Sequence, residues 1–243
     1  MVGLDMNEFE WQGYTWKSGA PWGIIHPDNT RQWYDESAIE LRNNELILKT
    51  QYNPKYFPEL DTTSNIGVGL VHCPVRVRHG IYEIEAVLPT GKHLWPAFWI
   101  TGQDQWPPEI DIFEAYTNRW GNYLHWDWRT PFAFLNVKTN VHYGSYNAGT
   151  KEEIGGRSKY FTLKDPRKNI MRYTLLWLPD RLKIMYNGKL VREVTDQKIL
   201  SDINRFDMYI VLNNAVNEDA DLNDEHVTSE FRITKFRYTE YPR

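Results

Sequence analysis

Turn residues break the chain into many short β-prone segments, and no long stretch has the residue spacing of an amphipathic helix. In residues 80–88, apolar side chains alternate with Glu83 and Glu85, the pattern of a strand with one buried and one solvent-facing side. Asn187-Gly188 separates two further β-prone runs and indicates a tight hairpin turn. Many short strands with regular turns predict an all-β sandwich or barrel.

The expected strands lie between these turn signals along most of the chain. They are residues 38–41, 45–50, 65–73, 80–88, 94–100, 109–114, 123–128, 137–143, 173–178, 181–186, 189–194, 207–212 and 231–238. Only residues 196–204 suit a short helix, and residues 8–34, 51–64 and 144–168 read as loops. The amides and aromatic residues of 28–34 either rim a cleft or cap the fold.

Neither a linker nor an internal repeat divides the 243 residues, so residues 1–243 are expected to form a single domain. Hydrophobic residues make up 41% of the chain, enough to bury a sizeable core. Aromatic residues reach 15%, with 11 Trp and 15 Tyr. A core rarely needs so many tryptophans, whereas a sugar-binding cleft uses flat aromatic faces to stack on pyranose rings.

Charge and cysteine content exclude several kinds of partner and site. The net charge of −4 argues against a nucleic-acid partner, which would require a basic surface. The one cysteine, Cys73, excludes an internal disulfide and reads as a buried structural residue. No apolar run reaches the roughly 20 residues of a membrane span, and residues 1–5 do not begin a signal peptide. A monomer is expected.

Three carboxylates lie within six residues of an apolar, β-prone stretch: Glu109, Asp111 and Glu114. On a strand, Glu109 and Asp111 point to the same face, whereas Glu114 would point to the opposite face of a regular strand. One extra residue at Ile112-Phe113 would return Glu114 to the first face. A β-bulge inserts such a residue, commonly beside active sites. The spacing therefore predicts a bulged strand with three acids on one face.

Crowded carboxyl groups cannot all ionise readily, because like charges raise the pKa of at least one of them. The result is a protonated acid beside an ionised base or nucleophile, which glycoside hydrolysis requires. A metal site and a solvated acidic strand are the alternatives that the residue pattern alone leaves open.

Several segments together resemble glycoside hydrolase family 16, which includes laminarinases, lichenases, agarases, porphyranases and carrageenases. The resemblance covers most of the chain and rests on residues 79–86, 91–99, 109–114, 173–188 and 209–216. The pairing of W-P-A-F-W at 95–99 with E-I-D-I-F-E at 109–114 is its most specific part. The resemblance implies a concanavalin-like β-jelly roll sandwich, in which two curved antiparallel sheets form a concave substrate cleft.

The resemblance also assigns catalytic roles. It implies that Glu109 is the nucleophile, that Glu114 is the general acid/base and that Asp111 tunes the charge and proton of the nucleophile. A retaining double displacement needs its two carboxyl groups about 5–5.5 Å apart, which a single strand face can provide.

Further positions match the substrate-binding residues of the family. His142 matches a histidine that reaches the cleft, with a structural histidine as the alternative. Trp95, Trp99 and Trp106 resemble stacking residues of the groove. Trp126 and Trp128 are candidates for which core packing is equally expected. Asn29 lies where an amide-rich loop of the family approaches the substrate.

The chain departs from the family pattern at three positions. Thr30 replaces the usual Glu beside Asn29, and Pro108 replaces the Gly that often precedes the first catalytic Glu. Thr234 is the nearest match to an Asp that binds calcium in some members. No metal or cofactor is therefore predicted.

The expected function is endo-hydrolysis of β-1,3-glucan or mixed-linkage β-1,3-1,4-glucan outside the cell. The alternative is hydrolysis of an algal galactan (agarose, porphyran or carrageenan), in which arginines would bind the sulfates. The candidates for that role are Arg31, Arg76, Arg119 and Arg129. A non-catalytic glucan-binding protein is a third hypothesis, and the three retained carboxylates argue against it.

Overall fold

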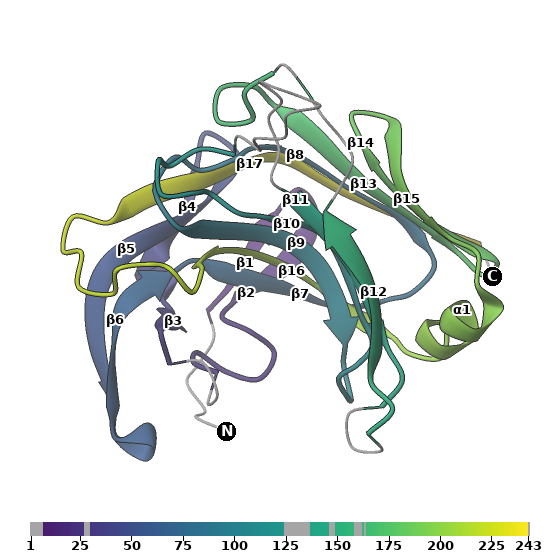
Figure 1. The fold of residues 1–243 in the computed structure, drawn as a ribbon, viewed down its shortest axis with the longest axis horizontal. Helices are drawn as coiled ribbons and strands as arrows, with labels where there is room; N and C mark the ends of the chain where they lie inside the picture. Colours follow the sequence, from purple (N-terminus) through teal and green to yellow (C-terminus); the bar gives the residue numbers. More distant parts are fainter. Residues whose placement is uncertain are drawn as a thin grey trace.

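The protein folds into two stacked β-sheets (Figure 1). The structure is a computed structural model and describes residues 7–26, 30–123, 137–145, 149–157, 162 and 164–242. The eight-stranded sheet consists, in spatial order, of β1 (Glu8–Trp11), β2 (Tyr14–Ser18), β7 (Leu70–Val77), β16 (Met208–Val216), β9 (Leu94–Gly102), β10 (Glu109–Ala115), β11 (Val137–Tyr143) and β12 (Glu152–Arg157).

The second sheet has nine strands. Its order is β15 (Lys189–Val194), β14 (Arg181–Tyr186), β13 (Met171–Leu178), β8 (Gly80–Val87), β17 (Thr228–Glu240), β5 (Glu45–Phe57), β6 (Thr62–Val68) and β3 (Gln32–Tyr34), with β4 (Ile39–Arg42) paired to β5. All pairs in both sheets are antiparallel except β3 with β6, which is parallel. The predicted all-β sandwich is confirmed, and the β3–β6 pair corrects the expectation of purely antiparallel sheets.

The main core lies between the two sheets and is built from alternate residues of their strands. On β8, the apolar residues of the alternating pattern (Tyr82, Ile84 and Ala86) are fully buried there. On the other face, Glu85 is partly exposed as expected, but Glu83 is only 7% exposed. Side-chain partners explain this burial, because Glu83 accepts a hydrogen bond from Thr174 and pairs with Arg237.

Several tryptophans belong to the core rather than to a binding surface. Trp11, Trp16, Trp33 and Trp177 are at most 8% exposed. The high tryptophan content therefore reflects the aromatic packing of the interior as well as a cleft, which corrects the inference drawn from composition. Trp16 is an example of this interior packing, because its ring packs edge-on against Phe236 with the centroids 4.9 Å apart.

Three stretches expected to be loops contain strands. Residues 8–34 include β1, β2 and β3, residues 51–64 contain the end of β5 and the start of β6, and residues 144–168 include β12. These strands carry polar or glycine-containing sequences, because parts of them are solvent-exposed and need no continuous apolar face. The expected strand at 65–73 divides at Gly69, where a Cβ would lie 2.6 Å from the Ala38 carbonyl oxygen.

The predicted short helix is present as α1 (Gln197–Ile203), and two 3₁₀ helices span Glu36–Ala38 and Pro58–Leu60. The Asp196 side chain caps α1 by accepting a hydrogen bond from the Lys198 N–H at 2.8 Å. None of the helices in the described part of the chain has the length and apolarity needed to span a membrane.

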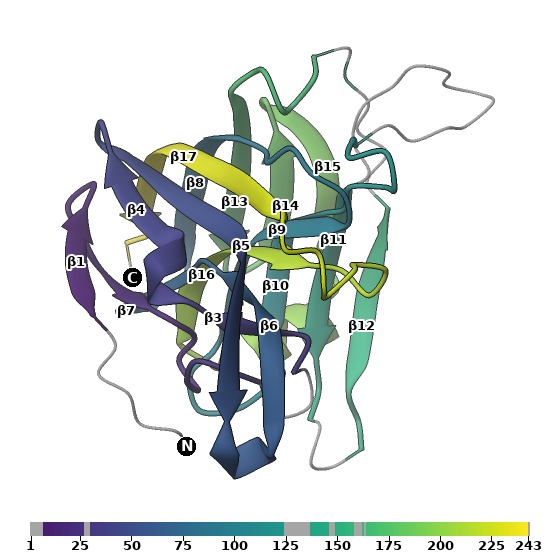
Figure 2. The same cartoon turned by 90° about the vertical axis from the view of Figure 1, so that its left-hand side faces the viewer.

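The two sheets curve together, and two hairpins extend from the sandwich on the same side. The β5–β6 hairpin and the β11–β12 hairpin both project downward in the two perpendicular views (Figure 2). Strands β9, β10 and β16 occupy the middle of the eight-stranded sheet. Their outward-facing side chains form the surface described next.

Candidate active site

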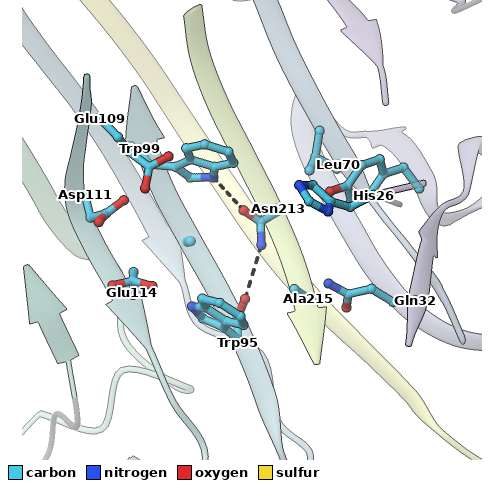
Figure 3. A pocket seen from close by; sticks show the side chains of 12 residues that line it. His26, Gln32, Leu70, Trp95, Trp99, Glu109, Asp111, Glu114, Asn213 and Ala215 are labelled. Atoms are coloured by element: carbon cyan, nitrogen blue, oxygen red, sulfur yellow. Dashed lines mark hydrogen bonds between the residues drawn. The ribbon is translucent and has the colours of Figure 1, made fainter. Parts of the chain in front are cut away.

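Strand β10 carries the predicted bulge. Asp111 pairs with Trp99 of β9, and the next paired residue on β10 is Phe113, opposite Phe98. On the β11 side, the register shifts by one residue between Asp111 and Glu114. Ile112 is therefore the additional residue, and the bulge prediction is confirmed. It restores Glu114 to the face that carries Glu109 and Asp111 (Figure 3).

The bulge forms because consecutive apolar residues enter the core. Ile110, Ile112 and Phe113 are fully buried, and the Phe113 ring lies 4.2 Å from the Tyr173 ring, centroid to centroid. The Tyr186 hydroxyl donates a hydrogen bond to the Ile112 carbonyl oxygen at 2.8 Å. A strand of the opposite sheet thus holds the backbone of the bulge in place.

Replacing Tyr186 with phenylalanine should lower the free energy of unfolding by about 1–3 kcal/mol, because it removes the donor to a buried carbonyl group. It should also lower turnover, since Ile112 lies between Asp111 and Glu114. Urea denaturation and initial rates would measure both effects. Tyr56→Phe is the control because the Tyr56 side chain is exposed and its hydroxyl donates to the side chain of Asp61 rather than to a buried backbone group. Equal stability of the two variants would contradict this account of the bulge.

The outward face of β9 and β16 forms the floor of a cleft beside the carboxylates. Trp95 and Trp99 both line it, as Figure 3 shows. Asn213 fixes them, because its Oδ1 accepts a hydrogen bond from the Trp99 indole N–H at 2.7 Å and its Nδ2 donates to the Trp95 carbonyl oxygen at 3.2 Å. The two tryptophans predicted to line the groove therefore reach it.

The remaining cleft wall comes from residues that the sequence analysis did not name individually. His26, Leu70 and Ala215 line it together with Gln32 and Tyr34. The last two lie in the 28–34 segment, for which a cleft rim was one of the two interpretations. The sequence could not identify Leu70 and Ala215 as cleft residues, because both are ordinary apolar strand residues and only strand pairing decides which face of the sheet they occupy.

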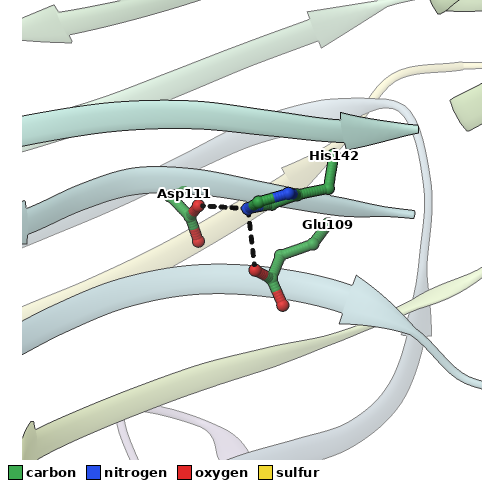
Figure 4. A group of neighbouring side chains, drawn as sticks. All are labelled: Glu109, Asp111 and His142. Carbon is green, nitrogen blue, oxygen red and sulfur yellow. Dashed lines mark ion pairs between the residues drawn. The ribbon is translucent and has the colours of Figure 1, made fainter. Parts of the chain in front are cut away.

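Trp106 and His142 lie beside the nucleophile predicted at Glu109. The Trp106 indole N–H donates to Glu109 Oε2 at 3.2 Å, and its ring centroid lies 5.6 Å from that of His142. His142 Nε2 lies 3.5 Å from Glu109 Oε1 and 3.5 Å from Asp111 Oδ2 (Figure 4). The His142 side chain is 12% exposed and contacts two of the carboxylates that line the cleft, and its role in substrate binding stays a prediction. Trp106 contacts the carboxylate directly, in addition to any stacking on a sugar.

Glu114 has different neighbours. The Tyr116 hydroxyl donates a hydrogen bond to Glu114 Oε1 at 2.9 Å, and the Tyr116 ring stacks on Trp95 with centroids 5.4 Å apart. Lys138, the cross-strand partner of Glu114, places its ammonium group 4.8 Å from the centre of the Tyr116 ring.

Burial raises the pKa of all three carboxyl groups. The pKa values of Glu109 and Asp111 lie well above their ordinary range, chiefly through desolvation and then through neighbouring carboxylates. The pKa of Glu114 is also raised by burial, but hydrogen bonding from Tyr116 and the Lys138 charge oppose the rise. Every influence on Asp111 acts upward, through burial, Glu114 and Glu153. Asp111 is thus the group best suited to hold a proton between the other two.

Replacing Tyr116 with phenylalanine should move the basic limb of the kcat/KM–pH profile to higher pH. Loss of the donated hydrogen bond raises the pKa of Glu114, and a general acid stays protonated up to its pKa. A pH series of initial rates would measure the shift. Tyr143→Phe is a matched control, because the Tyr143 hydroxyl donates to Glu152 instead. A basic limb that stays in place or moves downward in Tyr116→Phe would contradict the assignment.

The remaining predicted residues divide into two groups. Asn29, Trp126, Trp128 and Arg129 lie outside the described residues. The other candidate arginines do not line the cleft. Arg31 donates a hydrogen bond to the Glu218 carbonyl oxygen at 2.6 Å, and Arg119 lies over the Trp120 ring. Arg76 is exposed on β7.

The absence of a metal or cofactor remains a prediction. One compact group of potential ligand atoms is present among the described residues. One atom each of Glu109, Asp111 and His142 lies within 4.8 Å of the others, and these are the contacts shown in Figure 4. At the position of the family's calcium-binding Asp, the Thr234 hydroxyl donates to the Glu85 carbonyl oxygen at 3.0 Å.

Comparison with known proteins gives consistent matches over most of the chain. A sequence model of the family described as "Glycosyl hydrolases family 16" matches residues 28–231. The galactan endo-beta-1,3-galactanase of Flammulina velutipes is 26% identical over 178 residues, which cover 65% of this chain and 71% of that protein. The glucan endo-1,3-beta-glucosidase of Cryptopygus antarcticus is 30% identical over 152 residues, which cover 57% of this chain and 50% of that protein.

The fold also matches solved structures. LamAcat from Zobellia galactanivorans superposes with a TM-score of 0.71 at 19% sequence identity, covering 90% of this chain and 89% of that chain. This likeness establishes a shared fold.

Proposed function

Because the chain belongs to glycosyl hydrolases family 16, we propose that it is a retaining endo-hydrolase of β-1,3-linked glucan, with mixed-linkage β-1,3-1,4-glucan as a related substrate. The observation that carries the proposal is the bulge in β10. It places Glu109, Asp111 and Glu114 on one face of the strand, at the edge of a cleft floored by tryptophans. One strand face thus supplies both carboxyl groups of a double displacement.

In the proposed reaction, Glu109 attacks the anomeric carbon while Glu114 protonates the leaving oxygen. Burial raises the pKa of Glu114, which favours the protonated form that a general acid needs. Burial also raises the pKa of Glu109, and the neighbouring His142 and the hydrogen bond from Trp106 oppose that rise. Trp106 donates to one oxygen of Glu109, so that contact orients the nucleophile. Glu114 then removes a proton from water, the water attacks the glycosyl-enzyme ester, and Glu109 leaves. Two displacements at the same carbon retain the β configuration.

The proposed linkage rests on the two curated relatives described above. One is named as a β-1,3-galactanase and the other as a β-1,3-glucosidase acting on glucan, so both names specify a β-1,3 bond. Trp95 and Trp99 offer apolar faces on which a neutral pyranose can stack. We propose glucan rather than a sulfated galactan as the principal sugar, because none of the described candidate arginines lines the cleft to bind sulfate.

Hydrolysis of a galactan is the second candidate function, and the Flammulina velutipes relative favours it. The third hypothesis, a non-catalytic glucan-binding protein, would not need three carboxyl groups with raised pKa values in one cleft. We also propose that the enzyme acts outside the cell, because intact polysaccharides do not cross membranes, and that it acts as a monomer.

Reducing-sugar release tests the substrate class. The panel should contain laminarin, barley mixed-linkage glucan, β-1,3-galactan, agarose, porphyran and κ-carrageenan. We expect release from laminarin, accompanied by a rapid fall in polymer length that marks endo action. Release from a galactan alone would refute glucan as the substrate. No release from any polymer by the folded protein, combined with retained glucan binding, would instead support the non-catalytic hypothesis.

A further inference from the structure

His142 connects the carboxyl groups of β10 to a fourth carboxylate on the edge strand. It pairs across the ladder with Glu109 of β10 on one side and with Glu153 of β12 on the other. Its Nε2 faces Glu109 and Asp111, whereas its Nδ1 lies 3.1 Å from Glu153 Oε2. The contact is an ion pair by distance without hydrogen-bond geometry, and Nδ1 has no hydrogen-bond partner among the described residues.

Asn140 fixes which ring nitrogen of neutral His142 carries the proton. Its Oδ1 accepts a hydrogen bond from the Val141 backbone N–H at 2.9 Å, which orients the side-chain amide. Its Nδ2 therefore points toward His142 and lies 3.1 Å from Nε2. An amide N–H is a donor, so Nε2 acts as the acceptor and the ring proton is on Nδ1. That proton faces Glu153.

We propose that Glu153 is a positioning residue for catalysis, which holds His142 in the Nδ1–H tautomer with Nε2 turned toward Glu109 and Asp111. This inference rests on the proposed function. A partner that fixes the tautomer and orientation of a functional histidine commonly matters for activity although it does not touch the substrate. Asn140 Nδ2 also approaches Glu153 Oε2 at 3.4 Å, which helps to hold the carboxylate in place. Glu153 can act in this way although its side chain is 55% exposed, because a carboxylate 3.1 Å from Nδ1 favours the proton on that ring nitrogen electrostatically.

The kinetics of Glu153 variants can distinguish the loss of His142 orientation from a general structural effect. Glu153→Ala should lower kcat about tenfold with little change in KM, in line with the loss of other orienting partners. Glu153→Gln keeps an acceptor oxygen and should retain most of kcat. The matched control is Glu152→Ala on the same strand. Glu152 pairs with Tyr143 and Lys198 rather than with His142, so this variant should keep the wild-type kcat.

A double-variant test identifies the route of the effect. In a His142→Gln background, Glu153→Ala should cause no additional loss of kcat, because both changes remove the same contact. A further tenfold loss of kcat when Glu153→Ala is added to His142→Gln would overturn the proposal. So would an unchanged kcat in Glu153→Ala alone, or an equal loss in Glu152→Ala.

The tautomer can be measured without substrate. Ring nitrogen chemical shifts of ¹⁵N-labelled protein, assigned with His142→Gln, should show Nδ1 protonated in the wild type and a shift toward the Nε2–H form in Glu153→Ala. A wild-type His142 with its proton on Nε2 would overturn the inference. If the wild type hydrolyses no polysaccharide of the panel, the proposed function fails, whereas the NMR result still decides whether Glu153 sets the tautomer.

Discussion

Glu109→Gln should abolish turnover, with a loss of roughly 10⁴-fold or more, while the protein still binds the polysaccharide. Glutamine has nearly the same shape but cannot form the glycosyl-enzyme ester at a useful rate. Its side-chain oxygen can still accept from the Trp106 indole N–H, so the cleft should keep its shape. Reducing-sugar release would measure turnover, and affinity electrophoresis in laminarin gels would measure binding.

The role of Glu109 can be tested separately by chemical rescue. In Glu109→Ala, added azide should occupy the space of the carboxylate, attack the anomeric carbon of an activated aryl β-glycoside and give the α-glycosyl azide. The control is Glu193→Gln on β15 of the nine-stranded sheet, where the Glu193 side chain pairs with Lys183 of the neighbouring strand β14, and this variant should keep full activity. Full hydrolysis by Glu109→Gln, or a β-glycosyl azide from Glu109→Ala, would show that Glu109 is not the nucleophile.

Glu114→Ala should show a loss that depends on the leaving group. With polysaccharide the loss should be about 10²–10⁴-fold, because an alkoxide leaves poorly without general acid assistance. With a dinitrophenyl β-glycoside, which leaves without a proton, formation of the glycosyl-enzyme should be nearly as fast as in the wild type. Burst kinetics with this substrate would measure that step.

Azide rescue also distinguishes Glu114 from Glu109. In Glu114→Ala, azide should attack the glycosyl-enzyme in place of activated water and give the β-glycosyl azide, the opposite anomer to that expected for Glu109→Ala. Equal losses on the polysaccharide and on the dinitrophenyl glycoside would contradict the general acid role. Circular dichroism and thermal unfolding would verify that each variant is folded.

The central feature of the site could be predicted because its sequence pattern is local. Glu109 and Asp111 are two residues apart, and Glu114 comes three residues later, between apolar residues that must enter the core. Only an inserted residue lets the three acids share one face of the strand while the apolar residues between them enter the core. The observed register, with Ile112 additional, follows from this local conflict.

Other parts of the site depend on pairings between distant segments. Leu70, Gln32 and Ala215 meet in one cleft wall only because β7, β3 and β16 are assembled there. Glu153 lies in the β11–β12 region, in a glycine-containing stretch that resembles a loop because an edge strand needs no apolar alternation. Its contact with His142 arises from strand register, which the sequence does not reveal.

Amino-acid composition predicted the location of the tryptophans least well. The 11 tryptophans suggested a sugar-binding surface, yet the inter-sheet core uses Trp16 and Trp177 as packing residues. The position of a tryptophan on its strand decides which role it takes. Trp95 and Trp99 are four residues apart on β9 and share the outward face with Ala97 between them.

The most direct test is the anomeric configuration of the first product. Proton NMR spectra recorded during the first minutes of laminarin hydrolysis, at high enzyme concentration, distinguish the two anomers before mutarotation mixes them. Two displacements by Glu109 and water predict that the β-anomer appears first and that the α-anomer follows slowly. An α-anomer formed first would mean a single displacement and would contradict the assignment of Glu109 as nucleophile.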